Sequence, residues 1–244
     1  MFDSNTQLKV IVVGARGGLG EAVVQLLLEQ FNVVKVWATS RQHLSFEDVR
    51  VQSIQMNLQD EASIASAAEE IRNDDVPNLL INCAGILHTE SFGPEKTWRH
   101  LNFAVMQEVF QINAFAPVML GKYFLPLFSR KDEGLFLSCS ARVGSISDNQ
   151  LGGWYSYRAS KSAHNMFMKT LSLEARNRLA KCCIISYHPG TIDTELSKPF
   201  TRNYDPQKLF TPQAGAEYLW KVIQQVQVPD SGQFIAWDGQ RIEF

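Results

Sequence analysis

A single stretch decides the fold: Val10-Ile11-Val12-Val13-Gly14-Ala15-Arg16-Gly17-Gly18-Leu19-Gly20. A short apolar run leads into a glycine-rich turn with the spacing Gly-x-x-x-Gly-x-Gly, and apolar residues at helical spacing follow in Glu21–Gln30. Glycine lets the backbone turn tightly and lets a pyrophosphate come close, while the first N–H groups of the next helix attract negative charge. The stretch therefore predicts a strand, a dinucleotide-binding turn and a helix.

Strand-like and helix-like segments alternate along the rest of the chain. Short apolar strands separated by helices of ten or more residues are typical of βαβ units, which form a parallel sheet with helices on both faces. We therefore expect one Rossmann-type, doubly wound α/β domain over residues 1–244, with about seven strands. The expected strands are Leu8–Val13, Val33–Ala38, Val51–Met56, Leu79–Asn82, Leu135–Cys139, Cys182–Tyr187 and Gln233–Trp237; the expected helices are Glu21–Gln30, Asp60–Arg72, two within Thr97–Ser129, Tyr155–Leu179 and Ala214–Val226.

Composition and charge exclude several classes of partner. The 244 residues are 45% hydrophobic and 20% charged, with a net charge of -2, so the chain forms a core and has no basic footprint for nucleic acid. No signal peptide or window near the roughly 18 apolar residues of a membrane span is found, so we expect a cytoplasmic protein without membrane contact. The cysteines lack metal-ligand spacing, which predicts small buried residues and no metal site: Cys83, Cys139, Cys182 and Cys183.

The residues after the second expected strand indicate which nucleotide binds. Val36–Arg41 carries no acidic residue where NAD enzymes place one for the ribose 2′-hydroxyl. Arg41 stands there instead, and a guanidinium can bind a 2′-phosphate bidentately, with Arg16 as a second cation. We therefore expect NADP(H) to be favoured over NAD(H). The alternative interpretation of Arg41 is a solvated surface charge.

Tyr157 and Lys161 lie four residues apart in an expected helix, so they share one face about one turn apart. A tyrosine at its ordinary pKa near 10 is a poor base at neutral pH but a good acid toward a developing alkoxide. A nearby ammonium favours the phenolate, so we expect Lys161 to lower the pKa of Tyr157. The pair predicts proton transfer.

Together these motifs resemble the short-chain dehydrogenase/reductase family over essentially the whole chain. Asn82-Cys83-Ala84-Gly85 is similar to the family's Asn-Asn-Ala-Gly motif, and Tyr157 with Lys161 matches its Tyr-x-x-x-Lys. The resemblance implies that Asn113 holds a proton-relay water. It also implies that these residues bind the cofactor: Gly14, Arg16, Gly18, Leu19, Gly20, Ser40, Arg41, Asn57, Leu58, Asn82, Ala84, Gly85, Tyr157, Lys161, Pro189, Gly190, Ile192 and Thr194.

A narrower resemblance points to the branch of C-factor and carbonyl reductases. It rests on three runs, Gly144-Ser145-Ile146, residues 152–161, and Trp237-Asp238-Gly239-Gln240. This resemblance implies NADPH-dependent reduction of a small carbonyl substrate, or oxidation of the corresponding alcohol, by a homodimer or homotetramer.

Two positions depart from the family pattern. Asn57 stands where members usually carry an aspartate that contacts adenine, and an amide can still hydrogen-bond the ring. The family's catalytic serine usually lies three residues before a glycine, which here gives Ala141. We predict that Ser140 fills the role, because a turn at a strand end can re-aim one side chain; Ser138 is the other serine nearby.

Other functions remain open on the sequence alone. A C-factor type protein would bind NADP(H) for signalling or regulation with little catalysis, and the alanine at 141 favours this alternative slightly. A nucleotide-sugar epimerase is disfavoured, because only about 50 residues follow Pro189-Gly190, whereas those relatives usually carry a larger C-terminal substrate domain. The weakly patterned segment Pro199–Pro212 is either a substrate lid or a plain surface connection.

Overall fold

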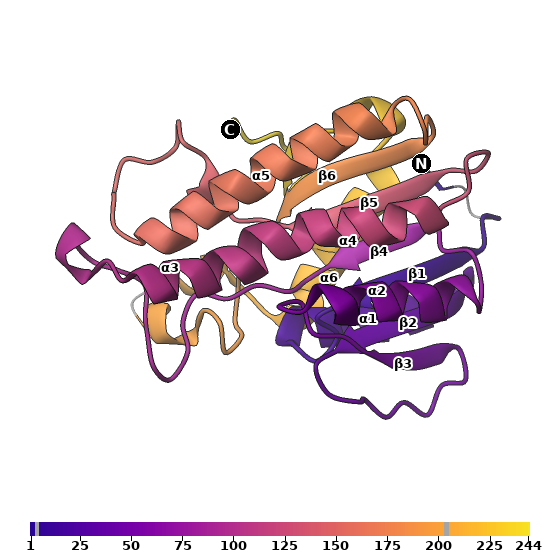
Figure 1. The fold of residues 1–244 in the computed structure, drawn as a ribbon, viewed down its shortest axis with the longest axis horizontal. Helices are drawn as coiled ribbons and strands as arrows, with labels where there is room; N and C mark the ends of the chain where they lie inside the picture. Colours follow the sequence, from indigo (N-terminus) through magenta and orange to yellow (C-terminus); the bar gives the residue numbers. More distant parts are fainter. Residues whose placement is uncertain (3–4, 203–204) are drawn as a thin grey trace.

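The computed structural model describes residues 1–2, 5–202 and 205–244. Seven strands form one parallel sheet in the order β3-β2-β1-β4-β5-β6-β9 (Figure 1). The strands are β1 Leu8–Val13, β2 Val33–Ser40, β3 Val51–Gln55, β4 Leu79–Asn82, β5 Gly134–Cys139, β6 Cys182–His188 and β9 Phe234–Ala236. The strand order reverses between β1 and β4, as in a doubly wound sheet, so the expected fold is confirmed.

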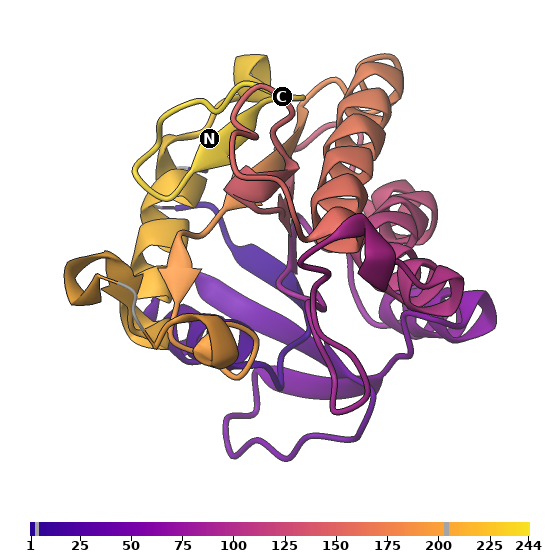
Figure 2. The same cartoon turned by 90° about the vertical axis from the view of Figure 1, so that its left-hand side faces the viewer.

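Helices cover both faces of this sheet. On one face lie α1 (Gly18–Glu29) and α6 (Pro212–Gln225); on the other lie α2 (Glu61–Arg72), α3 (Phe103–Phe110), α4 (Ala116–Phe124) and α5 (Tyr155–Ala175) (Figure 2). Each face of the sheet packs against its helices in a separate hydrophobic core. Successive side chains of a strand enter the two cores in turn, because they point to opposite faces. The neighbours Cys182 and Cys183 accordingly lie in different cores.

The long helical stretch differs from the expected pair of separate helices. A π-helical turn at Gln111–Phe115 joins α3 to α4, so Phe103–Leu127 runs on as one helix. Its length and its mean hydropathy of 1.3 over 18 residues are enough to cross a membrane, which makes the expectation that no window approaches a membrane span wrong by that measure. In the fold this helix packs against α2 and α5, and 33% of that window is buried.

The segment after β6 has more structure than the sequence pattern indicates. Two short 3₁₀ turns, Lys198–Phe200 and Pro206–Lys208, flank Asn203 and Tyr204, which lie outside the described residues. The strand β8 (Leu209–Phe210) then pairs in parallel with β7 (Thr191–Ile192). The segment Pro199–Pro212 is therefore tied at its far end to the loop that follows β6, which leaves both interpretations, a lid or a surface connection, open.

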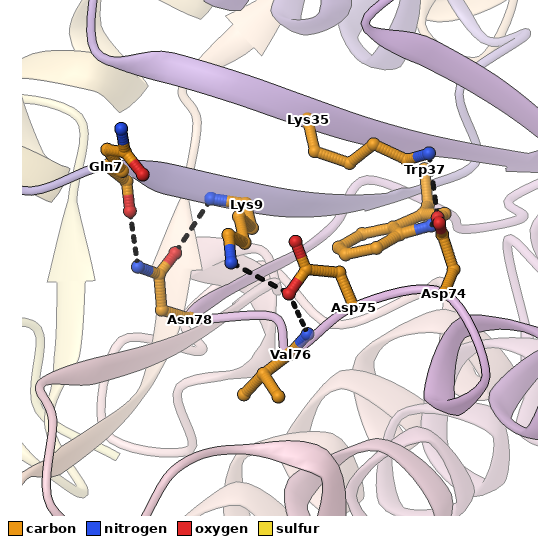
Figure 3. A network of polar contacts seen from close by, with 8 residues as sticks. All are labelled: Gln7, Lys9, Lys35, Trp37, Asp74, Asp75, Val76 and Asn78. Carbon is orange, nitrogen blue, oxygen red and sulfur yellow. Dashed lines mark hydrogen bonds and ion pairs between the residues drawn. The ribbon is translucent and has the colours of Figure 1, made fainter.

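A polar network ties the amino ends of the strands together (Figure 3). The Lys9 ammonium of β1 and the Lys35 ammonium of β2 each lie 2.7 Å from a carboxylate oxygen, of Asp75 and Asp74 respectively. The side chain of Asn78 accepts a hydrogen bond from the Lys9 N–H at 2.9 Å. These contacts fix the turn between α2 and β4 at the edge opposite to the candidate site.

Candidate active site

The predicted site residues gather at the carboxyl edge of the sheet. Because the strands are parallel, the turns that follow β1, β4, β5 and β6 all leave from this edge, beside the reversal in strand order (Figure 2). In open α/β sheets ligands bind in the crevice that such a reversal creates.

The turn after β1 is packed too closely to admit a Cβ at two of its glycines. Gly14 has a φ of 80°, and a Cβ on Gly20 would lie 2.2 Å from the Gly14 carbonyl oxygen. A Cβ on Gly18 would lie 2.8 Å from the Thr194 Cγ2, so the loop after β6 closes over the turn. No side chain caps α1 at Gly17, which leaves the helix's first N–H groups to a ligand.

Arg16 and Arg41 both lie beside the end of β2. Ser40 ends this strand, and its hydroxyl hydrogen-bonds the backbone of Gln42. The side chain of Gln42 accepts a hydrogen bond from the Arg16 guanidinium, which draws the glycine turn toward the residues after β2. Arg41 is exposed, and its guanidinium forms no ion pair with any residue that the structure describes.

Asn57 and Leu58 follow β3, the strand beside β2. The Asn57 side-chain oxygen accepts a hydrogen bond from the Gln59 N–H at 3.1 Å, and the Asn57 N–H donates to the Ser63 hydroxyl at 2.9 Å. Leu58 packs against the core under α2. Asn57 therefore shapes the turn into α2, and its predicted contact with adenine stays a prediction.

Asn82 holds the turn that follows β4. Its side-chain N–H donates to the Ser138 hydroxyl at 2.9 Å, and its side-chain oxygen accepts from the Ala84 N–H at 3.1 Å. A Cβ on Gly14 would lie 3.0 Å from the Ala84 nitrogen, and a Cβ on Gly85 would lie 3.5 Å from the Lys161 Nζ. This turn therefore joins the glycine turn to the proton-transfer pair.

Tyr157 and Lys161 both lie on the buried face of α5. Their exposed fractions are 8% and 3%, and the Lys161 Nζ lies 5.8 Å from the centroid of the Tyr157 ring. The same ammonium donates a hydrogen bond to the Cys139 carbonyl oxygen at 2.9 Å, at the end of β5. The sequence spacing thus places the two groups together at the edge of the sheet.

The expected lowering of the Tyr157 pKa is not found. Burial raises the pKa of Tyr157 above its ordinary value near 10, because a phenolate loses its hydration there. Burial also lowers the pKa of Lys161, to about 8. The phenol is therefore neutral at physiological pH, which suits a proton donor.

Ser140 lies on the face of the sheet that α5 covers. Phe136 of β5 points into the core under α5, and alternation continues that side through Ser138 to Ser140, while Ala141 falls on the other side. Ser138 already bonds Asn82. Ser140 is only 4% exposed, yet its hydroxyl has no hydrogen-bond partner among the described residues. This arrangement supports the choice of Ser140.

Asn113 lies in the π-helical turn, and such turns are frequent at functional sites. Its side chain pairs with the backbone of Ile86, accepting from the N–H at 2.8 Å and donating to the carbonyl at 2.7 Å. Its own carbonyl oxygen lies 3.1 Å from the His164 Nδ1. The structure thus gives Asn113 a role in holding the turn after β4, and its water remains a prediction.

The Pro189–Thr194 segment follows β6 and bends back over the glycine turn. Gly190 has a φ of 79°, and a Cβ there would lie 2.7 Å from the ring of Phe210. Ile192 belongs to β7, and its carbonyl accepts a hydrogen bond from the Ser197 hydroxyl. The segment is therefore packed in place, with Thr194 against the turn, and the predicted contacts of Ile192 and Thr194 with the cofactor stay predictions.

Sequence reasoning missed the anchor of α5. The buried Glu95 side chain accepts a hydrogen bond from the Ser156 N–H at 3.1 Å, and its carbonyl accepts from the Trp154 N–H at 2.5 Å. Trp154 has a φ of 51°, and its ring packs edge-on against those of Tyr157 and Phe200. The preceding Gly152-Gly153 signals such a turn, whereas nothing in the sequence around Glu95 signals its role.

Comparisons with known proteins agree with this geometry. The family model described as short chain dehydrogenase matches residues 8–205. The chain is 26% identical to the 1-hydroxy-2-glutathionyl-2-methyl-3-butene dehydrogenase of a Rhodococcus species, covering 96% of this chain and 99% of the relative. It is also 26% identical to the C-signal of Myxococcus xanthus, covering 68% and 91%.

Among solved structures, the NADPH-bound carbonyl reductase from chicken fatty liver matches with a TM-score of 0.85. The two chains are 26% identical, and the match covers 98% of this chain and 100% of the reductase. Since the family model spans most of the chain and the relatives match over nearly its full length, the chain belongs to the short chain dehydrogenase family of oxidoreductases.

Proposed function

We propose that this protein is an NADP(H)-dependent carbonyl reductase, which transfers hydride between the nicotinamide and a small carbonyl or alcohol substrate. The observation that carries the proposal is the unpartnered, buried Ser140 hydroxyl on the face of the sheet that α5 covers, the helix of Tyr157 and Lys161. The chicken relative, named as an NADPH-bound carbonyl reductase, supports the same activity.

The chain's own residues fit an NADP(H) cofactor. Gly18 and Gly20 admit no Cβ without a clash, so the backbone of the turn after β1 stays free of side chains there, and the uncapped start of α1 offers N–H groups to a pyrophosphate. Arg41 and Arg16 would hold a ribose 2′-phosphate at the end of β2, where no acidic side chain competes for the arginines.

The protein's part in the reaction is to hold an oxygen and move a proton. When bound, the cofactor supplies or accepts the hydride. The Ser140 hydroxyl and the Tyr157 phenol donate hydrogen bonds to the carbonyl oxygen of the substrate, and Tyr157 then passes its proton to the developing alkoxide. Lys161, fixed by the Cys139 carbonyl, holds the ribose hydroxyls and its charge offsets the phenolate left on Tyr157.

A regulatory NADP(H)-binding protein is the second candidate, favoured by the likeness to the Myxococcus C-signal. Such a protein would bind cofactor without turnover. A screen of aldehydes, ketones and quinones therefore separates the two, because only a reductase oxidises NADPH in the presence of a carbonyl.

Titration with NADPH and NADH, followed by nicotinamide fluorescence, tests the cofactor. We expect NADPH to bind more tightly than NADH. Arg41→Ala should weaken NADPH binding by roughly tenfold or more, because one charge-assisted contact is lost, and should change NADH binding little. Arg130→Ala, an exposed arginine in the turn before β5, is the matched control. Equal affinity for both cofactors would contradict the assignment of Arg41.

Tyr157→Phe tests the chemistry in the same preparation. This variant should keep NADPH binding and lose nearly all turnover, because the ring remains and only the proton donor is removed. Retained turnover would show that another group moves the proton.

A further inference from the structure

Two cysteines meet at the carboxyl edge of the sheet, although their sequence positions suggest no relation. Asn82 pairs with Ser138 in the parallel ladder of β4 and β5, so the next residues, Cys83 and Cys139, are lateral neighbours. Cys139 lies in the core under α1 and α6, and Cys83 packs against the same core. Neighbouring strands lie about 4.8 Å apart, within the Cα separation that a disulfide spans.

The Cys139 thiol lies close enough to influence the Cys83 thiol. A hydrogen bond between the Cys83 and Cys139 side chains, together with burial, raises the pKa of the Cys83 thiol. Both cysteines are free, and Cys83 is half-buried whereas Cys139 is buried, so Cys83 is the more accessible of the two. Cys182 and Cys183 lie in opposite cores and therefore cannot pair with each other.

We propose that Cys83 and Cys139 form a reversible disulfide site that low-molecular-weight disulfides of the glutathione type oxidise. One cysteine thiolate attacks a sulfur of the oxidant RSSR, and RS⁻ leaves as the mixed disulfide forms. The second cysteine attacks the protein sulfur of that mixed disulfide, and the second RS⁻ leaves. The two protons go to the two leaving thiolates, so the protein dithiol is oxidised and RSSR is reduced to two RSH.

The position of the pair links its oxidation to the cofactor site, an inference that rests on the proposed function. Cys83 stands between Asn82 and Ala84, and Ala84 contacts Gly14 of the phosphate turn. The Cys139 carbonyl holds the Lys161 ammonium. A covalent link fixes both side chains between the two turns that hold Ala84 and Lys161, so we expect the oxidised protein to bind NADPH roughly tenfold more weakly, and dithiothreitol to restore binding.

The experiment oxidises the full-length protein with oxidised glutathione, counts free thiols and maps the linked peptides by mass spectrometry. We expect four thiols to fall to two, with Cys83 joined to Cys139, and reduction to return four. Cys83→Ala and Cys139→Ala should each prevent the linkage, and either variant suffices if the other does not fold. Cys182→Ala, also buried, is the matched control and should still form it.

Peptide mapping decides the proposal without any activity assay. Four free thiols after prolonged exposure, or a linkage that survives Cys83→Ala, would overturn it. NADPH affinity, measured on the same samples, decides the consequence: unchanged affinity in the linked protein would overturn control of the cofactor site. Failure of the reduced protein to bind NADPH overturns the proposed function instead, while the mapped linkage still decides the disulfide site.

Discussion

At the scale of single residues, the Ser140 hydroxyl is the clearest mark of function. Burying a hydroxyl without a hydrogen bond costs about 1–3 kcal/mol, and the described residues hold three such hydroxyls, on Thr39, Ser140 and Tyr187. Ser138, two residues earlier on the same side of the strand, accepts a hydrogen bond from the Asn82 side chain at its hydroxyl. Ser140 therefore carries a destabilising feature that a substrate oxygen would relieve.

This reasoning predicts a split between activity and stability in Ser140→Ala. Turnover of a carbonyl substrate should fall roughly 100-fold, because a hydrogen-bond donor to the developing oxyanion is lost. The free energy of unfolding in urea should not fall, because the removed hydroxyl has no partner among the described residues. The two measurements on one preparation separate a functional hydroxyl from a structural one.

The double variant Ser140→Ala with Ala141→Ser is the control for position. Ala141 lies on the opposite side of the chain, so a serine there should not restore turnover. Recovery of activity would instead place the catalytic hydroxyl at the family's usual position, 141.

Sequence spacing was enough to bring Tyr157 and Lys161 together, because four residues make about one helical turn. It was not enough for their electrostatics. The pKa of Tyr157 rises because neighbouring segments bury it, and burial depends on the whole fold. The side of the sheet to which Ser140 points likewise depends on where β5 ends. The sequence around the serines does not reveal that end.

At the scale of elements, the buried strands were predicted to within two residues, because apolar runs between turn residues mark them clearly. The π-helical turn at Gln111–Phe115 adds one residue to a helix without changing its apolar character, so the pattern predicted two helices instead of one. The two-residue strands β7 and β8 are too short to produce a pattern. The turn before β4 was not predicted either, since its ion pairs join residues distant in sequence.

That turn predicts a dependence of stability on pH. The Lys35 ammonium and the Trp37 indole N–H hydrogen-bond Asp74, and they outweigh burial and hold the pKa of Asp74 below its ordinary value (Figure 3). A depressed pKa contributes stability above the unfolded value near 4, and that contribution is lost as the pH falls through the folded pKa. Asp74→Asn should therefore cost about 1 kcal/mol or less at pH 7, because the pair is partly exposed.

Urea unfolding at pH 7 and at pH 3 checks this expectation. The difference between the native chain and Asp74→Asn should shrink at the lower pH. Glu174→Gln, in an exposed pair with Arg178, should show no difference at either pH. A constant difference for Asp74→Asn would mean that the carboxylate charge is not what stabilises the turn.

At the scale of the whole molecule, several large apolar side chains are exposed on α5 and on the π-helical turn beside it. Met166 and Leu173 lie seven residues apart on α5, hence on one side, with exposed fractions of 65% and 47%. Phe115 is 48% exposed and contacts Phe167 of α5, which makes the patch continuous across the two helices. Exposed apolar patches of this kind mark interaction sites.

We propose that a second copy of the chain covers this patch, in line with the oligomer that the family resemblance implies. In a two-fold interface the same patch is buried on both subunits, so Met166→Glu introduces two charges and should prevent the dimer from forming. Light scattering at micromolar concentration should give twice the chain mass of 27.5 kDa for the native protein and the single mass for the variant. Val49→Glu, at a fully exposed apolar side chain in a loop, should leave the oligomer intact. A native protein that scatters as a single chain would contradict the proposed dimer.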